Sequence, residues 1–158
     1  MPQNNSKINT RHMTNAALLP EVVRLIDAGH TVTLPLRGYS MRPFLEDGRD
    51  KALLAAVDNI TLGMPVLAET YPDQYVLHRI VAIDGEHVTL LGDGNITPEH
   101  CRLSDIKAVA VAFYRKGRTV PDRTDGRKWR TYSWLWTRLR PIRRYLLFIY
   151  RLFLKIKA

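Results

Sequence analysis

The chain reads GYSMRPFLEDG at residues 38–48, directly after a segment, 31–37, in which polar and apolar side chains alternate. This alternation has the two-residue period of a half-buried strand, and Pro35 within it favours an edge strand or a bulge. Pro43 biases the residue before it away from the helical conformation, and Glu-Asp-Gly at 46–48 is typical of a turn. The stretch therefore predicts a strand that ends in a tight turn, where the side chain of Ser40 is exposed.

Ser40 is a candidate nucleophile if the chain also supplies the groups that activate a hydroxyl. A catalytic serine needs a base within hydrogen-bond reach and donors for the oxyanion that forms. His78, 38 positions later in an apolar run, is a candidate base, and an imidazole with an ordinary pKa is already mostly neutral at pH 7. Asp93 in the segment LGDGN, or Glu99 a few positions on, could orient that imidazole. The structural alternatives are a serine that caps a turn, a packing histidine and an ordinary turn aspartate.

Three motifs in this order and spacing resemble the serine peptidase clan of type I signal peptidases and LexA-like self-cleaving proteins. They are SMRP at 40–43 with DG at 47–48, HRI at 78–80, and GDGN at 92–95, so that the resemblance spans residues 31–114. In that clan the serine of the Ser-Met pair is the nucleophile, and the base precedes an arginine in a later strand. The base is lysine in bacterial signal peptidases and LexA-like proteins. It is histidine in the endoplasmic-reticulum, archaeal and sporulating-bacterial signal peptidases, so this chain is more similar to the second branch.

The resemblance implies an activity and a set of site residues. It implies a signal-peptidase-like serine endopeptidase that cleaves a leader-type peptide or protein through a Ser-His acyl-enzyme mechanism, without cofactor or metal. Its catalytic residues would be Ser40, His78 and Asp93, with Glu99 as the alternative orienting acid. Residues that bind substrate or support the site would be Gly38, Tyr39, Met41, Pro43 and Arg79.

Gly38 marks a departure from the resemblance. Many bacterial signal peptidases carry a serine two positions before the nucleophile, and its hydroxyl helps to stabilise the oxyanion. The main-chain N–H of Ser40 would then supply more of that stabilisation here. Two other functions remain open: a non-catalytic, regulatory member of the clan that binds a peptide or partner, and a LexA-like self-cleaving protein, for which Ala28-Gly29 is a candidate cleavage dipeptide.

Apolar runs between turn residues predict a mainly β fold. Strands are expected at 31–37, 51–57, 66–70, 75–83, 87–91 and 106–114, with Asp-Gly at 84–85 favouring a hairpin. A short helix is expected from Thr14 to a stop at Gly29. These elements predict a β-rich, barrel-like domain over residues 14–114, as the resemblance also implies. The short helix has no second helix beside it, so a helix-turn-helix reader is not expected.

Charge divides the chain unevenly. Residues 1–114 hold 10 Lys and Arg against 13 Asp and Glu, whereas residues 115–158 hold 14 against 2. We expect a disordered N-terminus at 1–13, a polar linker at 115–130 and a basic amphipathic helix at 131–158, in which Pro141 is a kink or a fresh helix start. The apolar stripe of that helix is Leu135, Leu139, Ile142, Leu146, Ile149, Phe153 and Ile156.

Basic residues beside that stripe indicate an anionic membrane surface as a partner of residues 131–158, and the longest apolar run is too short to span a bilayer. The alternatives are that the stripe packs on the domain or a partner helix, or that the charge binds nucleic acid, for which no base-reading motif is present. The polar N-terminus shows neither a secretory signal nor an anchor, and the single Cys101 is compatible with a reducing compartment. The expected localisation is cytoplasmic or peripheral to a membrane, on an undetermined side, and the oligomeric state is not predicted.

Overall fold

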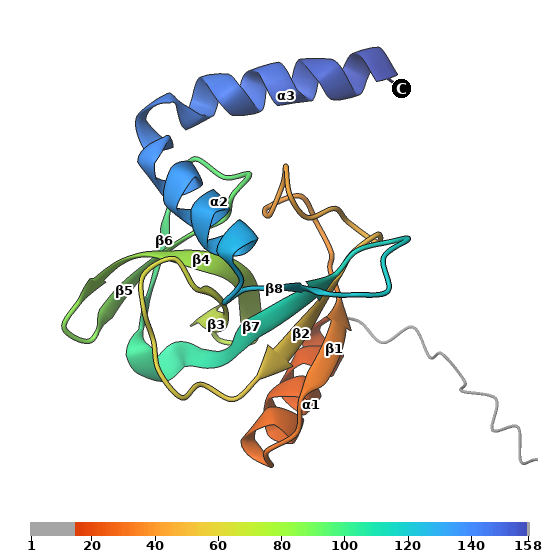
Figure 1. Cartoon of the computed structure of the whole chain (residues 1–158). Helices are drawn as coiled ribbons and strands as arrows, with labels where there is room; N and C mark the ends of the chain where they lie inside the picture. The colour runs from red at the N-terminus through yellow and green to blue at the C-terminus, as the bar shows by residue number, and fades with distance from the viewer. Residues whose placement is uncertain (1–14, 158) are drawn as a thin grey trace, which may run out of the picture.

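An antiparallel sheet organises the chain in this computed structural model, which describes residues 15–157 (Figure 1). Seven of its eight described strands follow the order β1-β2-β7-β3-β4-β5-β6, and the eighth, β8, pairs with β7. The fold is therefore mainly β. The strands are β1 (Val32–Pro35), β2 (Lys51–Ala55), β3 (Pro65–Tyr71), β4 (Gln74–Asp84), β5 (His87–Leu91), β6 (Glu99–Arg102), β7 (Ile106–Tyr114) and β8 (Asp122–Arg123).

Three α-helices and two 3-10 turns complete the described part of the chain. The helices are α1 (Asn15–Asp27), α2 (Arg127–Arg138) and α3 (Arg143–Lys157), and the turns are η1 (Leu103–Asp105) and η2 (Arg140–Ile142). Figure 1 shows α1 at one end of the molecule and α3 at the other, with α2 between α3 and the sheet. The expected disordered segment 1–13 and the expected helix start at Thr14 lie outside the described residues.

α1 packs its apolar face on one side of the sheet. Leu19, Val22 and Ile26 recur at helical spacing and are buried in a cluster with side chains of β1, β2 and β7. Gly29 follows the helix with a φ of +88°, a conformation that glycine adopts without strain, so the predicted stop is confirmed. A second apolar cluster, built from β3, β4, β5 and β6, includes Val66, Ile80 and Leu90.

All six predicted strands are present, with ends shifted by a few residues, and β1 is an edge strand as Pro35 indicated. Two strands were not predicted. β6 reads Glu-His-Cys-Arg and has no apolar alternation, and β8 has only two residues. Both form because a neighbouring strand supplies hydrogen bonds: β5 pairs with β6, and β7 pairs with β8.

The basic C-terminal part differs from the expected linker and single helix. The expected linker contains β8 and the start of α2, and the expected helix is interrupted at η2, where Pro141 lacks an N–H to donate. α2 packs on the domain, since Trp129, Ser133 and Trp136 are buried. The ring centroids of Trp129 and Phe113 are 4.8 Å apart. α2 therefore belongs to the domain, and α3 follows it after η2. No helix in the described part of the chain has the length and apolar content that crossing a membrane requires.

Candidate active site

Ser40 lies in a loop that joins β1 to β2 and is closed at its base. The main-chain N–H of Leu36 donates to the carbonyl of Asp50 at 2.9 Å, and the N–H of Gly48 donates to the carbonyl of Leu36 at 3.0 Å. The N–H of Gly38 donates to Asp47 Oδ1 at 2.8 Å. These bonds hold the loop in place while Ser40 stays half-buried at its surface.

The residues next to Ser40 divide between core and surface. Met41 is buried and anchors the loop in the core, whereas Tyr39 is 60% exposed. The guanidinium carbon of Arg42 lies 4.0 Å from the centroid of the Tyr39 ring, a cation–π contact within the loop. Pro43 is half-buried. The sequence-predicted supporting residues therefore surround Ser40, and their roles in binding substrate stay predictions.

His78 lies on β4 and hydrogen-bonds to Glu99 at the start of β6. His78 Nδ1 is 2.7 Å from Glu99 Oε2, and His78 is 4% exposed. The strand register explains how His78 and Glu99 come into contact across β5. Leu90 of β5 pairs with Ile80 of β4 on one side and with Glu99 of β6 on the other, and His78 lies two residues before Ile80. A carboxylate accepts a hydrogen bond, so this contact assigns the ring proton to Nδ1 and leaves Nε2 as an acceptor.

Burial lowers the pKa of His78 below its ordinary value of 6.5. The charges of Glu99, which also accepts the hydrogen bond, and of Asp93 oppose this shift but do not cancel it. The imidazole is therefore neutral at pH 7, and its contact with Glu99 is a hydrogen bond from a neutral ring to a carboxylate. This is the protonation state that a general base requires.

The glycines of the GDGN motif bring Ser40 and His78 together. The N–H of Gly94 donates to the carbonyl of Ser40 at 2.7 Å. A Cβ added to Gly92 would lie 2.5 Å from the carbonyl oxygen of Ser40 and 3.0 Å from His78 Nε2, so those two atoms lie no farther apart than the sum of these distances. Only glycine leaves room for this approach. All three sequence motifs thus meet around one point.

Ser40 and His78 also line the same pocket, whose volume is about 140 Å³. Its walls come from the Ser40 loop, which begins at Leu36, and from the first half of β4, and they include Leu45 and Leu77. The main-chain N–H of Ser40 has no acceptor within the part of the chain that the structure describes, whereas the N–H of Gly38 is already bonded to Asp47. Ser40 N–H is therefore not engaged by the described chain.

Asp93 does not contact His78, which corrects the prediction that it orients the imidazole. Its two carboxylate oxygens accept from Arg79 Nε at 2.9 Å and Arg79 Nη2 at 2.8 Å, and both residues are fully buried. Side chains alternate along a strand, so His78 and Arg79 leave β4 on opposite faces, and Asp93 is bonded to Arg79. Glu99, the alternative acid, is the residue that the structure brings to His78.

α2 completes the surroundings of the Arg79–Asp93 pair. The hydroxyl of Tyr132 donates to Asp93 Oδ2 at 2.6 Å, Trp136 Nε1 donates to the Asp93 carbonyl at 3.1 Å, and Arg79 Nη1 donates to Ser133 Oγ. Burial and the Asp93 carboxylate raise the pKa of Tyr132, so its phenol stays protonated and donates. Sequence reasoning missed these residues. Their signal was an aromatic stripe, Trp129, Tyr132 and Trp136, at steps of three and four.

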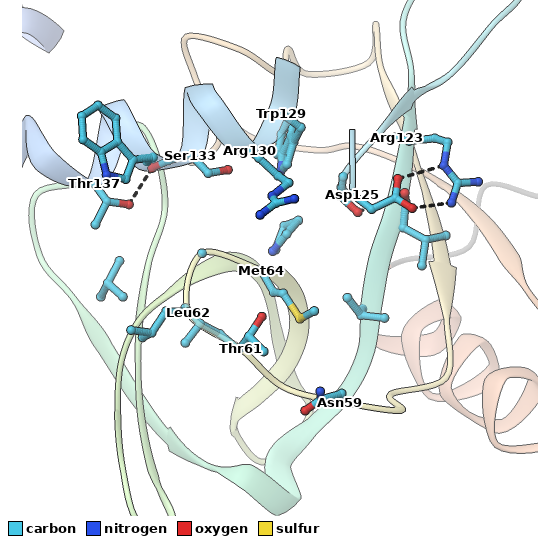
Figure 2. A pocket seen from close by; sticks show the side chains of 18 of the residues that line it. Asn59, Thr61, Leu62, Met64, Arg123, Asp125, Trp129, Arg130, Ser133 and Thr137 are labelled. Atoms are coloured by element: carbon cyan, nitrogen blue, oxygen red, sulfur yellow. Dashed lines mark hydrogen bonds and ion pairs between the residues drawn. The ribbon is translucent and has the colours of Figure 1, made fainter. Parts of the chain in front are cut away.

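A second and larger pocket, of about 880 Å³, lies elsewhere, between the β2–β3 connection and α2 (Figure 2). Thr61, Leu62 and Met64 of the β2–β3 connection face Trp129 and Ser133 of α2 across it. Its lining includes neither Ser40 nor His78. Ser133 lines this pocket and accepts a hydrogen bond from the buried Arg79. The pocket therefore lies beside the residues that hold Arg79 in place, and not beside Ser40 and His78.

Two other kinds of chemistry find no support in this site. Burial raises the pKa of the Cys101 thiol to about 11, which keeps the sulfur protonated and unreactive. Among the residues that the structure describes, no three His, Cys, Asp or Glu side chains gather as metal ligands would.

Comparison of the chain with models of known protein families and with curated proteins finds no match.

Proposed function

We propose that the chain is a signal-peptidase-like serine endopeptidase of the Ser-His type, with the β-rich fold of the clan that its motifs resemble. One observation carries the proposal: Ser40 lines the same small pocket as His78, a buried, neutral histidine whose second ring nitrogen is bonded to Glu99. A nucleophile, a base and a group that orients the base are the parts that acyl transfer needs.

The chemistry follows from the protonation states. Ser40 Oγ attacks the carbonyl carbon of the scissile peptide bond while His78 Nε2 accepts the hydroxyl proton. Glu99 stabilises the imidazolium that forms, because its carboxylate already accepts the Nδ1 proton. His78 then gives the Nε2 proton to the leaving amine, and an acyl-enzyme remains on Ser40. Water, deprotonated by His78, hydrolyses this ester and returns the enzyme to its starting state.

The unengaged N–H of Ser40 supports a role as oxyanion donor. It belongs to the nucleophile itself, so it lies close to the oxygen on which negative charge develops. The neighbouring Gly38 lacks a side-chain donor, and its own N–H is bonded to Asp47. We therefore expect a slow enzyme, since loss of one oxyanion donor lowers kcat by about 10²- to 10³-fold in a characterised peptidase.

An unpaired strand edge beside the pocket supports peptide binding. β3 pairs with β4 from Gln74 to Arg79, whereas β5 pairs with β4 only from Arg79 onwards. The N–H and C=O of Ile80 hydrogen-bond to Met64 and Gly63, on the β3 side of β4. Main-chain groups of successive residues point to alternate sides of a strand, so those of Leu77 and Tyr75 point to the opposite edge of β4. No strand of the described chain occupies that edge. An extended peptide can pair there and place a short side chain in the pocket.

The test is cleavage of extended peptides with small residues near the scissile bond. Wild type is expected to cleave, and Ser40→Ala is expected to lose about 10³-fold or more of kcat/KM. Ser104→Ala, which removes an exposed hydroxyl from η1, is the matched control and should keep full activity. Mass spectrometry should also detect an acyl group on Ser40 of the wild type. Equal cleavage by wild type and Ser40→Ala would contradict the proposal.

The same strand edge also favours the second candidate, a peptide-binding protein without catalysis. Such a protein would bind extended peptides with equal affinity in wild type and Ser40→Ala, and neither would cleave them. LexA-like self-cleavage has less support, because Ala28-Gly29 lies in the hydrogen-bonded end of α1 and not in an extended segment. An unchanged intact mass after prolonged incubation would exclude it.

A further inference from the structure

α3 presents apolar side chains on two opposite faces. On its inner face Leu147 is 3% exposed and Tyr150, which hydrogen-bonds to Glu46 of the domain, is half-buried. Its outer face is exposed, at fractions from 44% to 81%. Soluble domains rarely leave so many large apolar side chains uncovered on one surface. The outer α3 face consists of Tyr145, Phe148, Ile149, Leu152, Phe153 and Ile156, at steps of three, one, three, one and three.

The charge around this face restricts what can cover it. Residues 126–158 contain ten Lys and Arg and no Asp or Glu. Arg144, Arg151 and Lys155 are exposed and recur at steps of seven and four, so they lie along one flank of the outer α3 face. The occupant must therefore offer negative charge next to an apolar interior.

An anionic lipid bilayer meets both requirements. Its headgroups attract the basic flank while its acyl chains cover the apolar side chains, which is how amphipathic helices bind a membrane surface. A second copy of this chain would bring two clusters of like charge together. A nucleic acid would match the basic flank but leave the outer α3 face in water.

The inner face of α3 is joined to the loop that carries Ser40. The hydroxyl of Tyr150 donates to Glu46 Oε1 at 2.8 Å, and Arg42 Nε donates to Glu46 Oε2 at 2.9 Å. Figure 1 shows α3 passing over this loop, which connects β1 to β2. A surface that binds the outer α3 face would therefore lie close to the Ser40 pocket.

We propose that α3 docks the protein on an anionic bilayer and holds the Ser40 pocket near its surface, so that the substrate is a membrane-bound peptide. The substrate clause rests on the proposed endopeptidase function, whereas docking does not. Docking raises the local concentration of a substrate that shares the membrane, and it leaves the chemistry of Ser40 and His78 unchanged.

Docking is tested with the full chain by co-sedimentation with phosphatidylcholine vesicles, with and without phosphatidylglycerol. Wild type should bind the anionic vesicles and bind the neutral ones weakly. Phe148→Glu/Phe153→Glu should bind the anionic vesicles roughly ten-fold more weakly or worse, because each phenylalanine contributes apolar burial. The control is Val120→Glu/Ile83→Glu, which adds the same charge at exposed apolar positions outside α3 and should bind as wild type does. Thermal unfolding of each variant checks that it is folded.

Each contrary outcome identifies its cause. Equal vesicle binding by wild type and the α3 variant overturns the docking proposal. The docking proposal is also overturned if the wild type does not bind vesicles and instead forms a dimer, or binds RNA, through Phe148 and Phe153. If docking holds, the α3 variant should cleave a soluble peptide as wild type does but lose most of its cleavage of a lipid-anchored peptide on vesicles. Vesicle binding without cleavage of any peptide would refute the endopeptidase function and leave docking intact.

Discussion

Two adjacent residues of β4, His78 and Arg79, each meet a carboxylate, but on opposite faces of the strand and in different surroundings. On one face His78 contacts Glu99, whose side chain is 37% exposed, and borders the Ser40 pocket. On the other face Arg79 and Asp93 are fully buried and hydrogen-bonded by side chains of α2. The first pair therefore borders a pocket that a ligand can enter, whereas the second is closed to solvent.

The contrast shows how similar residue types acquire different roles. A buried ion pair is tolerated only when its remaining polar atoms find partners, and α2 and the Gly63 carbonyl supply them to Arg79 and Asp93. His78 instead stays neutral because burial lowers its pKa. We therefore expect changes on the Arg79 face to lower stability, and changes on the His78 face to alter the rate and its pH dependence.

The largest effect is expected from breaking the buried pair. Asp93→Asn leaves the Arg79 charge without its counter-ion and should lower the free energy of unfolding by about 3–5 kcal/mol, measured by urea denaturation. Asp125→Asn is the matched control, because Asp125 pairs with Arg123 on the surface, where solvent screens the charges, and its loss should leave stability nearly unchanged. A small effect of Asp93→Asn, equal to that of the control, would mean that the Arg79 face does not support the fold.

The next effect is expected at Glu99. Glu99→Gln should lower kcat/KM by about 10²-fold or more, with little loss of stability, because a neutral amide stabilises the imidazolium less well than a carboxylate. Glu99 opposes the burial that lowers the pKa of His78, so its removal should lower that pKa further. The acid limb of the pH–rate profile, which we expect below pH 6.5 in wild type, should therefore move to lower pH in the variant.

If the acid limb does not move in Glu99→Gln, Glu99 does not influence the pKa of His78.

The lowered pKa of His78 also has a consequence for wild-type stability. The unfolded chain protonates His78 as the pH falls through 6.5, the ordinary pKa of histidine, whereas the folded chain protonates it only at lower pH. This contribution to stability is complete above that pH and is lost as the pH falls below it.

The smallest effect is expected at Tyr132. Tyr132→Phe removes the hydrogen bond to Asp93 and should lower the free energy of unfolding by about 1–3 kcal/mol while leaving the pH–rate profile in place. Tyr145→Phe, on the exposed outer face of α3, is the control for loss of a phenol and should leave stability unchanged. A shifted pH–rate profile in Tyr132→Phe would show that the two faces of β4 are coupled.

The local pattern of the chain was sufficient to locate most strands, α1, and the loop and strand that carry Ser40 and His78. Periodicity and turn residues act over a few positions, so Pro35, Gly29 and the Asp-Gly at 84–85 report their own surroundings. Charge counting also separated the basic C-terminal part from the rest of the chain.

Tertiary structure was needed to show which carboxylate meets His78 and where the C-terminal residues lie. Asp93 is nearer to His78 in sequence, but the pleat of β4 and the pairing of β5 with β6 bring Glu99 to the imidazole, and β6 has no local signal. Similarly, the basic residues 127–138 resemble a solvated helix, yet Trp129 and Trp136 are buried because the domain offers Phe113, Phe44 and the Asp93 carbonyl. Contacts between distant segments depend on which strands and helices pack together, and that is a property of the whole chain.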